Sequence, residues 1–214
     1  MANTTYSILK FRGQDDLRKI VDYAIKDGRD FDFNSIEPIP DALKVEHVPY
    51  QDAAIGSYYN TLDREDQAAL IENLEDKHYT NVEDIIEQAA AQEKEQILVA
   101  EERIDLGQKY YENIMEHGYP DFFEWANAHW NTKGNAIDTV VDEEKLEISF
   151  STSSSAVEDL MKNLYEKTGV PFVYQYTDDT FTVYGEMCCD EEGIRNSEID
   201  EKWVKDIFAE RTAG

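Results

Sequence analysis

The spacing of apolar residues changes twice along the chain, and these changes constrain the fold more than any other feature of the sequence. Residues 5–12 are rich in β-forming residues and alternate weakly, which predicts a strand, and helical spacing predicts a helix over residues 14–27. Residues 31–34 predict another short strand. From about residue 43 to residue 130 the spacing is that of helices with long polar faces, with Gly107 as a candidate break. The sequence therefore predicts β-α-β followed by a helical block.

Strand patterns return after the helical block. Residues 136–141 and 145–151 predict a hairpin. Ser155 and Glu158 form a capping box at the start of the clearest helix pattern, and the stretch PFVYQYTDDTFTVYGE after this helix predicts two more strands. A last helix is predicted from Ile199 onward.

This order of elements is typical of an α+β protein. Split β-α-β units build a ferredoxin-like antiparallel sheet with helices on one face, so we expect such a sheet, split by a large acidic helical insertion. The expected parts are residues 1–41 and 135–190 for the two halves of the ferredoxin-like domain, residues 42–134 for the insertion and residues 191–214 for a C-terminal helix.

Acidic residues strongly outnumber basic ones. The 47 Asp and Glu and the 20 Lys and Arg give a formal net charge of −27, and residues 41–124 alone contain 21 acidic and 6 basic residues. Binding to nucleic acid or to anionic lipid depends on cations, so the charge argues against direct binding to either. Solubility and adaptation to high salt are two general explanations of such acidity.

No segment has the pattern of a membrane span or of a secretory signal. A membrane-spanning helix needs a run of about eighteen apolar residues, which the sequence lacks. The N-terminal MANTTYSILK has no basic region followed by an apolar core. Cys188 and Cys189 are adjacent, and neighbouring cysteines rarely adopt disulfide geometry. We therefore expect a soluble protein of a reducing cytoplasm.

Two stretches resemble the signatures of the YubB-type proteins of phages and conjugative plasmids, which carry a ferredoxin-like domain. The residues that match the first signature, within FDFNSIEPIPD, are Phe33, Asn34, Ile36, Pro38 and Pro40. The residues that match the second signature, within WANAHWNTKGNA, are Trp130, Thr132, Lys133, Asn135 and Ala136. Asn131 and Gly134 depart from it, because glycine and a second tryptophan are usual there. The resemblance implies the fold and a mobile-element origin, and it carries over no catalytic residue. For a protein of such an element, the expected cytoplasm is that of the host.

The region around the second signature is a candidate ligand pocket, because aromatic walls with convergent amides suit small-molecule recognition. The residues of this candidate pocket are Trp125, His129, Trp130, Asn131, Lys133 and Asn135. In the alternative that we favour, the tryptophans pack the end of the helical block onto the sheet and the asparagines bond the backbone of the following turn.

The remaining patterns argue against catalysis and cofactors. Tyr174, Tyr176 and Tyr184 resemble the stacking platform of RNA-binding sheets, but the acidic residues near them favour core or protein contacts. The four histidines and two cysteines lack metal-ligand spacing, and the sequence has no phosphate-binding glycine loop and no nucleophile elbow. We therefore expect no metal, no cofactor and no enzymatic activity, and keep a small enzyme that uses the candidate pocket as a third hypothesis.

The acidic helical block and the mobile-element resemblance together predict an anti-defence protein. CRISPR and restriction nucleases of the host have long cationic grooves, and a rigid block rich in carboxylates suits such a groove as a nucleic-acid mimic. The residues expected to bind this partner are Glu72, Glu75, Asp76, Glu83, Asp84, Glu87, Glu93, Glu95, Glu101, Glu102 and Asp105. The alternative for these residues is an ordinary solvated helix face.

The second hypothesis is a phage accessory module that binds proteins through its tyrosine-rich sheet or its C-terminal helix and has no catalytic activity. In this case Trp203, Ile207 and Phe208 form a homo-oligomer contact or dock on another phage protein. Charge reversal of the acidic residues and Trp203→Ala separate the two hypotheses, because each change affects only one of the two surfaces.

Overall fold

The computed structural model describes residues 4–26 and 30–208, apart from the side chains of Glu201 and Trp203. The chain is a mixed α+β protein with a six-stranded antiparallel sheet, and it divides into two compact units. Unit 1 contains Met1–Pro38 and Ala126–Gly214, and unit 2 contains Ile39–Trp125. The sequence places the helical block at residues 42–134, whereas unit 2 already ends within a helix, so a helical pattern alone does not locate this boundary.

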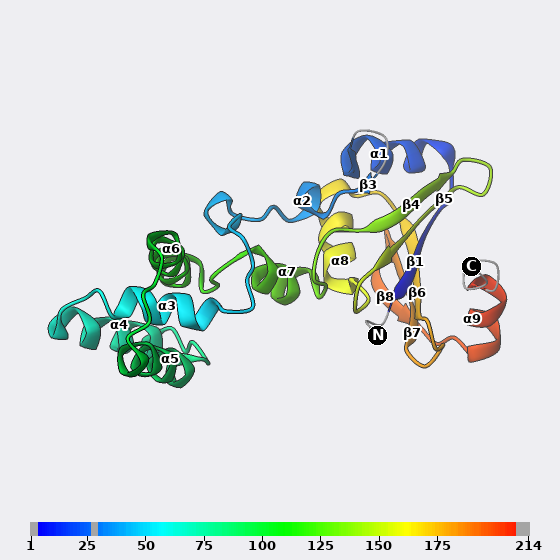
Figure 1. Ribbon diagram of the computed structural model, residues 1–214. Helices are drawn as coiled ribbons and strands as arrows, with labels where there is room; N and C mark the ends of the chain where they lie inside the picture. Colours follow the sequence, from blue (N-terminus) through cyan, green and yellow to red (C-terminus); the bar gives the residue numbers. More distant parts are fainter. Residues whose placement is uncertain (1–3, 27–29, 209–214) are drawn as a thin grey trace. The chain divides into compact units, whose positions relative to one another are not determined.

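Unit 1 contains the six-stranded sheet, in the order β4-β5-β1-β6-β7-β8 (Figure 1). Its strands are β1 (Thr5–Phe11), β4 (Ile137–Asp142), β5 (Glu147–Thr152), β6 (Phe172–Asp178), β7 (Tyr184–Asp190) and β8 (Gly193–Ser197). Each strand is antiparallel to its neighbours, and β1 pairs with β5 on one side and with β6 on the other. The strand predicted over residues 5–12 and the strands predicted after the helical block are confirmed, and β8 was not predicted.

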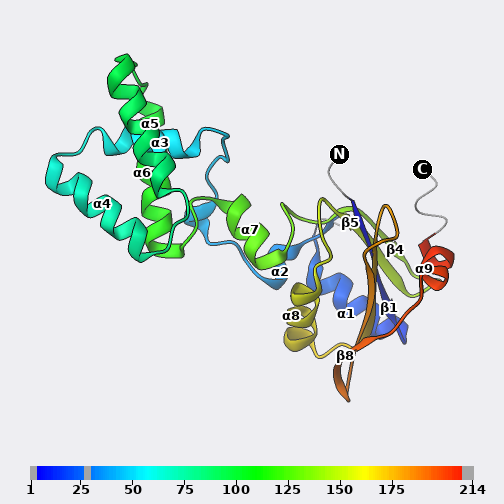
Figure 2. The ribbon, with the colours of Figure 1, turned by 90° about the horizontal axis from the view of Figure 1, so that it is seen from below.

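The two faces of the sheet carry different helices. α1 (Gln14–Ala24) and α8 (Glu158–Thr168) lie on one face, and α9 (Glu201–Phe208) lies on the other (Figure 2). Successive residues of a strand point to opposite faces. Accordingly, Ser7 of β1 hydrogen-bonds the hydroxyl of Tyr174 on the face of α8, and Ile8 packs against Val204 and Phe208 of α9 on the opposite face.

The segment between α1 and unit 2 differs from its prediction. β2 (Ile25–Lys26) and β3 (Asp30–Phe31) pair in a separate two-stranded sheet, and α2 (Phe33–Ile36) follows where the sequence predicts a strand up to residue 34. The side chain of Asp32 accepts a hydrogen bond from the backbone N–H of Asn34 at 3.2 Å and so caps α2. This local cap favours a helix over continued strand.

The capping box predicted at Ser155 and Glu158 is wrong. α8 begins at Glu158, its N-cap is Val157, and no side chain caps this end of the helix. The carboxylate of Glu158 instead accepts a hydrogen bond from the hydroxyl of Tyr176 at 2.5 Å. A tertiary partner from β6 therefore replaces the local bond that the sequence suggests.

Unit 2 is built from helices. Its elements are a 3-10 helix (Asp41–Leu43), α3 (Gln51–Tyr59), α4 (Arg64–Asp76), α5 (Val82–Glu95), α6 (Glu101–His117) and the first residues of α7 (Phe122–Trp130). α3 contacts both α5 and α6 (Figure 1). The core of unit 2 joins Ile55 of α3, Leu70 of α4, Ile85 of α5 and Tyr110 of α6. Among the described residues, no helix is long and apolar enough to cross a membrane.

Gly107 lies inside a continuous α6 and does not break the helix, so the suggested break is wrong. A Cβ atom at this position would lie 2.0 Å from the carbonyl oxygen of Ala54 in α3. The absence of a side chain therefore lets α6 approach the backbone of α3 closely. Gly107 is a packing residue of unit 2.

Candidate functional site

The eleven acidic residues expected to bind a partner all lie on the surface of unit 2, and each of them is exposed. They belong to α4, α5 and α6. Within the described part of the chain none of them forms an ion pair; the ion pairs of unit 2 are Lys44–Asp41, His47–Asp121 and His117–Glu116. Their negative charges are therefore not neutralised within the chain.

The position of each acidic residue follows from the buried side of its helix. The buried residues are Leu70 and Leu74 in α4, Ile85 and Ala89 in α5, and Tyr110 and Ile114 in α6. At about 100° per residue, two acidic residues four positions apart lie opposite the buried side of each helix. We call these six the ridge acids: Glu72, Asp76, Glu83, Glu87, Glu101 and Asp105. The other five, the flank acids, lie nearer to the buried sides: Glu75, Asp84, Glu93, Glu95 and Glu102.

A second group of polar residues in unit 2 was not predicted from the sequence. Asp121 is fully buried, and its carboxylate lies 2.7 Å from Nδ1 of His47 and accepts hydrogen bonds from the backbone N–H groups of Phe123 and Glu124. Gln51 donates to the carboxylate of Glu124 at 3.2 Å. Burial raises the pKa of Glu124 above its usual value, although this hydrogen bond opposes the shift. More than seventy positions separate the partners, so no local motif reveals the group.

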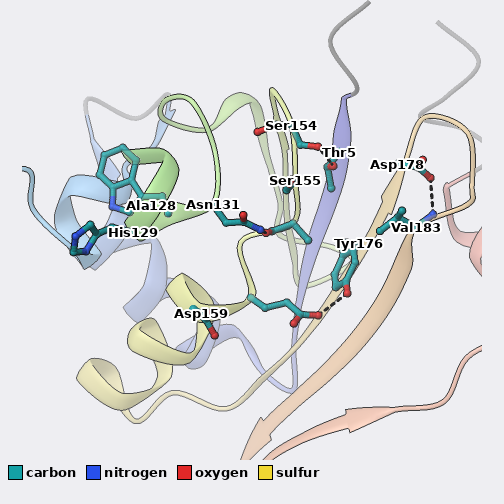
Figure 3. A pocket seen from close by; sticks show the side chains of 13 residues that line it. Thr5, Ala128, His129, Asn131, Ser154, Ser155, Asp159, Tyr176, Asp178 and Val183 are labelled. Carbon is teal, nitrogen blue, oxygen red and sulfur yellow. Dashed lines mark hydrogen bonds between the residues drawn. The ribbon is translucent and has the colours of Figure 1, made fainter. Parts of the chain in front are cut away.

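Unit 1 contains a pocket of about 560 Å³ at the N-terminal end of α8 (Figure 3). Three residues of the candidate pocket, His129, Trp130 and Asn131, line it. The rest of its wall comes from the start of β1, the loop before α8, the first turn of α8 and the end of β6. Trp125, Lys133 and Asn135 do not line it. The sequence therefore locates one wall of a pocket whose other walls lie far away along the chain.

All three carboxylates that line this pocket are engaged by side chains of the protein. Glu158 accepts the hydrogen bond from Tyr176, and burial together with this carboxylate raises the pKa of the Tyr176 hydroxyl (Figure 3). Asp159 pairs with Lys162 at 2.7 Å. Among the described residues only Asp159 of these carboxylates pairs with a cation, because the hydroxyl that bonds Glu158 is neutral.

The third carboxylate, Asp178, shapes the turn between β6 and β7. It accepts hydrogen bonds of 2.5 to 3.0 Å from the hydroxyl of Thr180, the hydroxyl and backbone N–H of Thr182 and the backbone N–H of Val183. Burial alone raises the pKa of a carboxyl group, but here these hydrogen bonds outweigh it, and the pKa of Asp178 lies below its usual value. Asp178 is thus an ionised residue that stabilises a turn.

Trp130 and Asn135 connect the two signature stretches. The ring of Trp130 packs edge-on against Phe33 with ring centroids 5.6 Å apart, and its Nε1 donates to the carbonyl oxygen of Glu37 at 3.0 Å. Asn135 Oδ1 accepts a hydrogen bond from the backbone N–H of Phe33 at 2.8 Å. Asn131 lies apart from these contacts and donates to the carbonyl oxygen of Ala156. The contacts are structural, as in the favoured alternative, but Trp130 packs on α2, and Asn131 and Asn135 bond backbone groups that are distant in sequence.

The C-terminal helix does not expose all three residues of the interface of the second hypothesis. Phe208 is buried with Ile8 and Val204, and Ile207 packs against the same cluster. The side chain of Trp203 lies outside the described residues. An amphipathic helix needs an apolar partner, and the second face of the sheet supplies it. The expectation that Phe208 faces an external partner is therefore wrong, whereas Ile207 is only partly buried.

The tyrosines of the sheet do not form one stacking platform. Tyr174 is fully buried, and burial raises the pKa of its hydroxyl to about 12. Tyr176 lies on the same face as Tyr174, whereas Tyr184 packs against the cluster beneath α9 on the opposite face. These residues therefore serve different parts of the core.

The adjacent cysteines are both free. Because residues alternate along β7, Cys188 and Cys189 point to opposite faces of the sheet. Burial raises the pKa of the Cys189 thiol to about 11. Among residues 4–26 and 30–208, no group of three or more His, Cys, Asp or Glu side chains is placed to hold a metal ion.

Comparison with known proteins gives little. No family model and no curated protein matches the chain. A crystal structure of a protein api92 from Yersinia pseudotuberculosis, with the family model DUF1281, is similar at 8% sequence identity and a TM-score of 0.41. The match covers 94% of this chain and 99% of that chain. This similarity is too low to assign a family.

Proposed function

We propose that unit 2 binds a partner protein in a cationic groove that otherwise holds nucleic acid. The observation that carries the proposal is the set of eleven exposed carboxylates without ion-pair partners on α4, α5 and α6. Unneutralised carboxylates attract a cationic surface and speed its association. The resemblance to mobile-element proteins makes a host CRISPR or restriction nuclease the proposed class of target, and the host cytoplasm the proposed location.

The ridge acids favour a groove over a flat partner surface. Leu70, Ile85 and Tyr110 lie in one core, so the three helices turn their buried sides toward it. The ridges on the opposite sides of these helices therefore point outward in different directions. A flat surface would contact one ridge, whereas the walls of a groove can contact more than one.

Leu98 gives the proposed contact surface an apolar residue. It lies between α5 and α6 and is 98% exposed, and the acidic residues Glu95 and Glu101 are close to it in sequence. A Leu side chain that becomes fully buried on binding contributes about 1.5–3 kcal/mol. Burial of Leu98 would stabilise a complex that charge attraction alone leaves sensitive to salt.

We also infer that unit 1 is a ferredoxin-like domain. The sheet order β4-β5-β1-β6, with α1 following β1 and α8 between β5 and β6, supports two split β-α-β units. In this interpretation, unit 2 is an acidic insertion between α1 and β4, and β7 and β8 extend the sheet beyond β6.

The test is affinity capture from a host lysate with the full chain and two neutralised variants. In the ridge variant the six ridge acids are changed from Glu to Gln and from Asp to Asn, and in the flank variant the five flank acids are changed in the same way. We expect the unchanged chain to capture a nucleic-acid-acting enzyme at low salt and to release it at high salt. The ridge variant should capture at least about tenfold less, and the flank variant should lose clearly less.

A competition measurement completes the test. The captured enzyme, loaded with a labelled oligonucleotide, should release the oligonucleotide when the chain is added. Equal capture by the ridge and flank variants would contradict a specific contact, and a captured partner that keeps its oligonucleotide would contradict mimicry. Circular dichroism of both variants checks that α4, α5 and α6 remain folded.

A further inference from the structure

β4 is an outer strand of the sheet, and its apolar side chains are unusually exposed. The sheet order places β5 on one side of β4 and no strand of the sheet on the other (Figure 1). Ile137, Val140 and Val141 are 48%, 57% and 36% exposed. They are three of the eight large apolar side chains that are exposed among the described residues, and all three lie in this six-residue strand.

The opposite edge of the sheet is built differently. β8 presents the exposed polar residues Arg195, Asn196 and Ser197, and Arg195 pairs with Asp190 at 3.1 Å. Charged and polar side chains on an edge strand oppose pairing with another chain. β4 contains no Lys and no Pro. The two edges therefore differ in how strongly they resist an added strand.

Only part of β4 is regular enough to accept a strand. The pairing with β5 shifts between Ile137 and Val140, and an irregularity of this kind hinders further pairing. From Val140 to Asp142 the register with β5 is regular. The backbone N–H of Phe31 in β3 donates to the side-chain hydroxyl of Thr139. This contact therefore uses a side chain of β4 and not its backbone. The open edge is therefore the segment from Val140 to Asp142.

A groove beside this segment sets the charge of a suitable partner. It has a volume of about 390 Å³; Asp138, Val140 and Asp142 line it on β4, and it extends inward over residues of β5 and β1, such as Ser149 and Tyr6. Lys145, which also lines the groove, lies 3.9 Å from Asp142. Two carboxylates with one lysine give this site a net negative charge. A side chain of an added strand that lies beside Asp138 and Asp142 is therefore favoured if it is cationic.

A second copy of this chain does not fit the same edge. Pairing of two β4 strands would bring the carboxylates of Asp138 and Asp142 of both copies close together. Like charges directly opposite one another destabilise a strand pair. Each copy also carries a net charge of −27. Charge therefore favours a basic partner over self-association.

We propose that β4 is a docking strand for an extended segment of a partner protein. The segment pairs with the backbone from Val140 to Asp142, covers the apolar side chains of Val140 and Val141, and places a Lys or Arg side chain beside Asp138 and Asp142. This contact lies in unit 1 and does not depend on the ridge acids of unit 2.

The probe for this proposal is a seven-residue peptide in which Lys and Val alternate, with a Glu and Val peptide of the same length as its control. The full chain is titrated with each labelled peptide, and hydrogen exchange at residues 137–142 is followed. We expect the Lys peptide to bind, to slow exchange at Val140, Val141 and Asp142 and to lose affinity with added salt. The Glu peptide should not bind.

Two matched substitutions distinguish the edge from the general acidity of the chain. Val140→Lys adds a charge to the open edge, and Val183→Lys adds the same charge at a residue that is 60% exposed in the turn between β6 and β7. Val140→Lys should weaken binding of the Lys peptide at least about tenfold, and Val183→Lys less than about twofold. Asp138→Asn together with Asp142→Asn should also weaken binding, because both negative charges are lost. The turn after β4 should remain folded, because Asn keeps the side-chain oxygen with which Asp142 accepts two backbone hydrogen bonds.

Three results would overturn the proposal. The first is that Val140→Lys and Val183→Lys weaken binding of the Lys peptide equally. The second is that the peptide slows hydrogen exchange in unit 2 and not in β4. The third is that the chain forms a concentration-dependent dimer in which hydrogen exchange at β4 is slowed. The ridge variant separates this contact from the proposed function, because it should bind the Lys peptide to β4 as the unchanged chain does.

Discussion

Replacing Gly107 with Ala tests the packing that holds unit 2 together. An Ala side chain normally stabilises a helix by about 1 kcal/mol relative to Gly. At Gly107, however, the added Cβ would lie 2.0 Å from the carbonyl oxygen and 2.5 Å from the carbonyl carbon of Ala54. Both atoms belong to the backbone of α3, so no side chain can rotate away. The Cβ atom and this carbonyl oxygen must separate by about 1.5 Å to reach an ordinary contact distance of about 3.5 Å, so α3 and α6 must move apart.

The expected cost follows from these opposing effects. Overpacking costs about 1–3 kcal/mol and occasionally more, and the clash with the backbone places Gly107→Ala at or above the upper end. The gain in helix propensity offsets about 1 kcal/mol of this cost. We expect a net loss of about 2 kcal/mol or more in the free energy of unfolding of unit 2. For a unit of this length, that loss lowers the melting temperature by at least about 8 °C.

Calorimetry of a series of glycine substitutions measures the effect. Gly56→Ala places a Cβ atom 3.0 Å from the carbonyl oxygen of Ile85 and should cost less than Gly107→Ala. Gly134→Ala meets no atom within 4 Å and should leave stability unchanged or slightly higher. The order of the three melting temperatures is the result to compare. If Gly107→Ala raises the melting temperature, as propensity alone predicts, the close approach of α3 and α6 is wrong.

Three further predictions concern single side chains. Burial raises the pKa of Glu124, so its ionised carboxyl destabilises the fold at neutral pH. Glu124→Gln should therefore raise the melting temperature at pH 7. This gain should shrink as the pH falls through the raised pKa and vanish below about 4.3, the pKa of an unfolded Glu. Asp178 has a lowered pKa, so Asp178→Asn should lower the melting temperature at pH 7, and this loss should shrink as pH falls below about 3.9. Leu98→Ser should leave the melting temperature unchanged and weaken capture of the unit 2 partner about tenfold, and unchanged capture would exclude Leu98 from the contact.

Elements with a regular apolar pattern were predictable from the sequence. Leu160, Met161 and Leu164 lie on the buried side of α8, and Ile148 and Phe150 are buried in β5, as their spacing predicts. A regular period survives because one face of the element is buried along its whole length.

Elements that depend on distant partners were not predictable. β8 has mostly exposed polar residues and forms because β7 offers an edge with which it can pair. The first turn of α8 bonds Tyr176 through Glu158, although Ser155 and Glu158 have the spacing of a capping box. In both cases a tertiary contact decides the outcome, and a local pattern contains no information about it.

The candidate sites show the same division. The exposure of the acidic residues follows from helical spacing, so the sequence was sufficient to place them on the surface. The pocket at α8 was only partly predictable, because Asn131 is near its other walls, such as Tyr176, only in the folded chain. The buried group around Asp121 was not predictable at all, since its partner His47 lies 74 positions away.

The arrangement of the ridge acids also bears on why unit 2 is acidic. Two like charges four residues apart destabilise a helix by about 0.2–0.5 kcal/mol, and each of α4, α5 and α6 carries such a pair. A lysine four positions after each first acid would maintain a charged, soluble surface and would stabilise the helix by a similar amount. Solubility alone therefore gives no reason for same-sign pairs such as Glu83 and Glu87. The partner proposed above would give one, because its cations would relieve the repulsion within each pair.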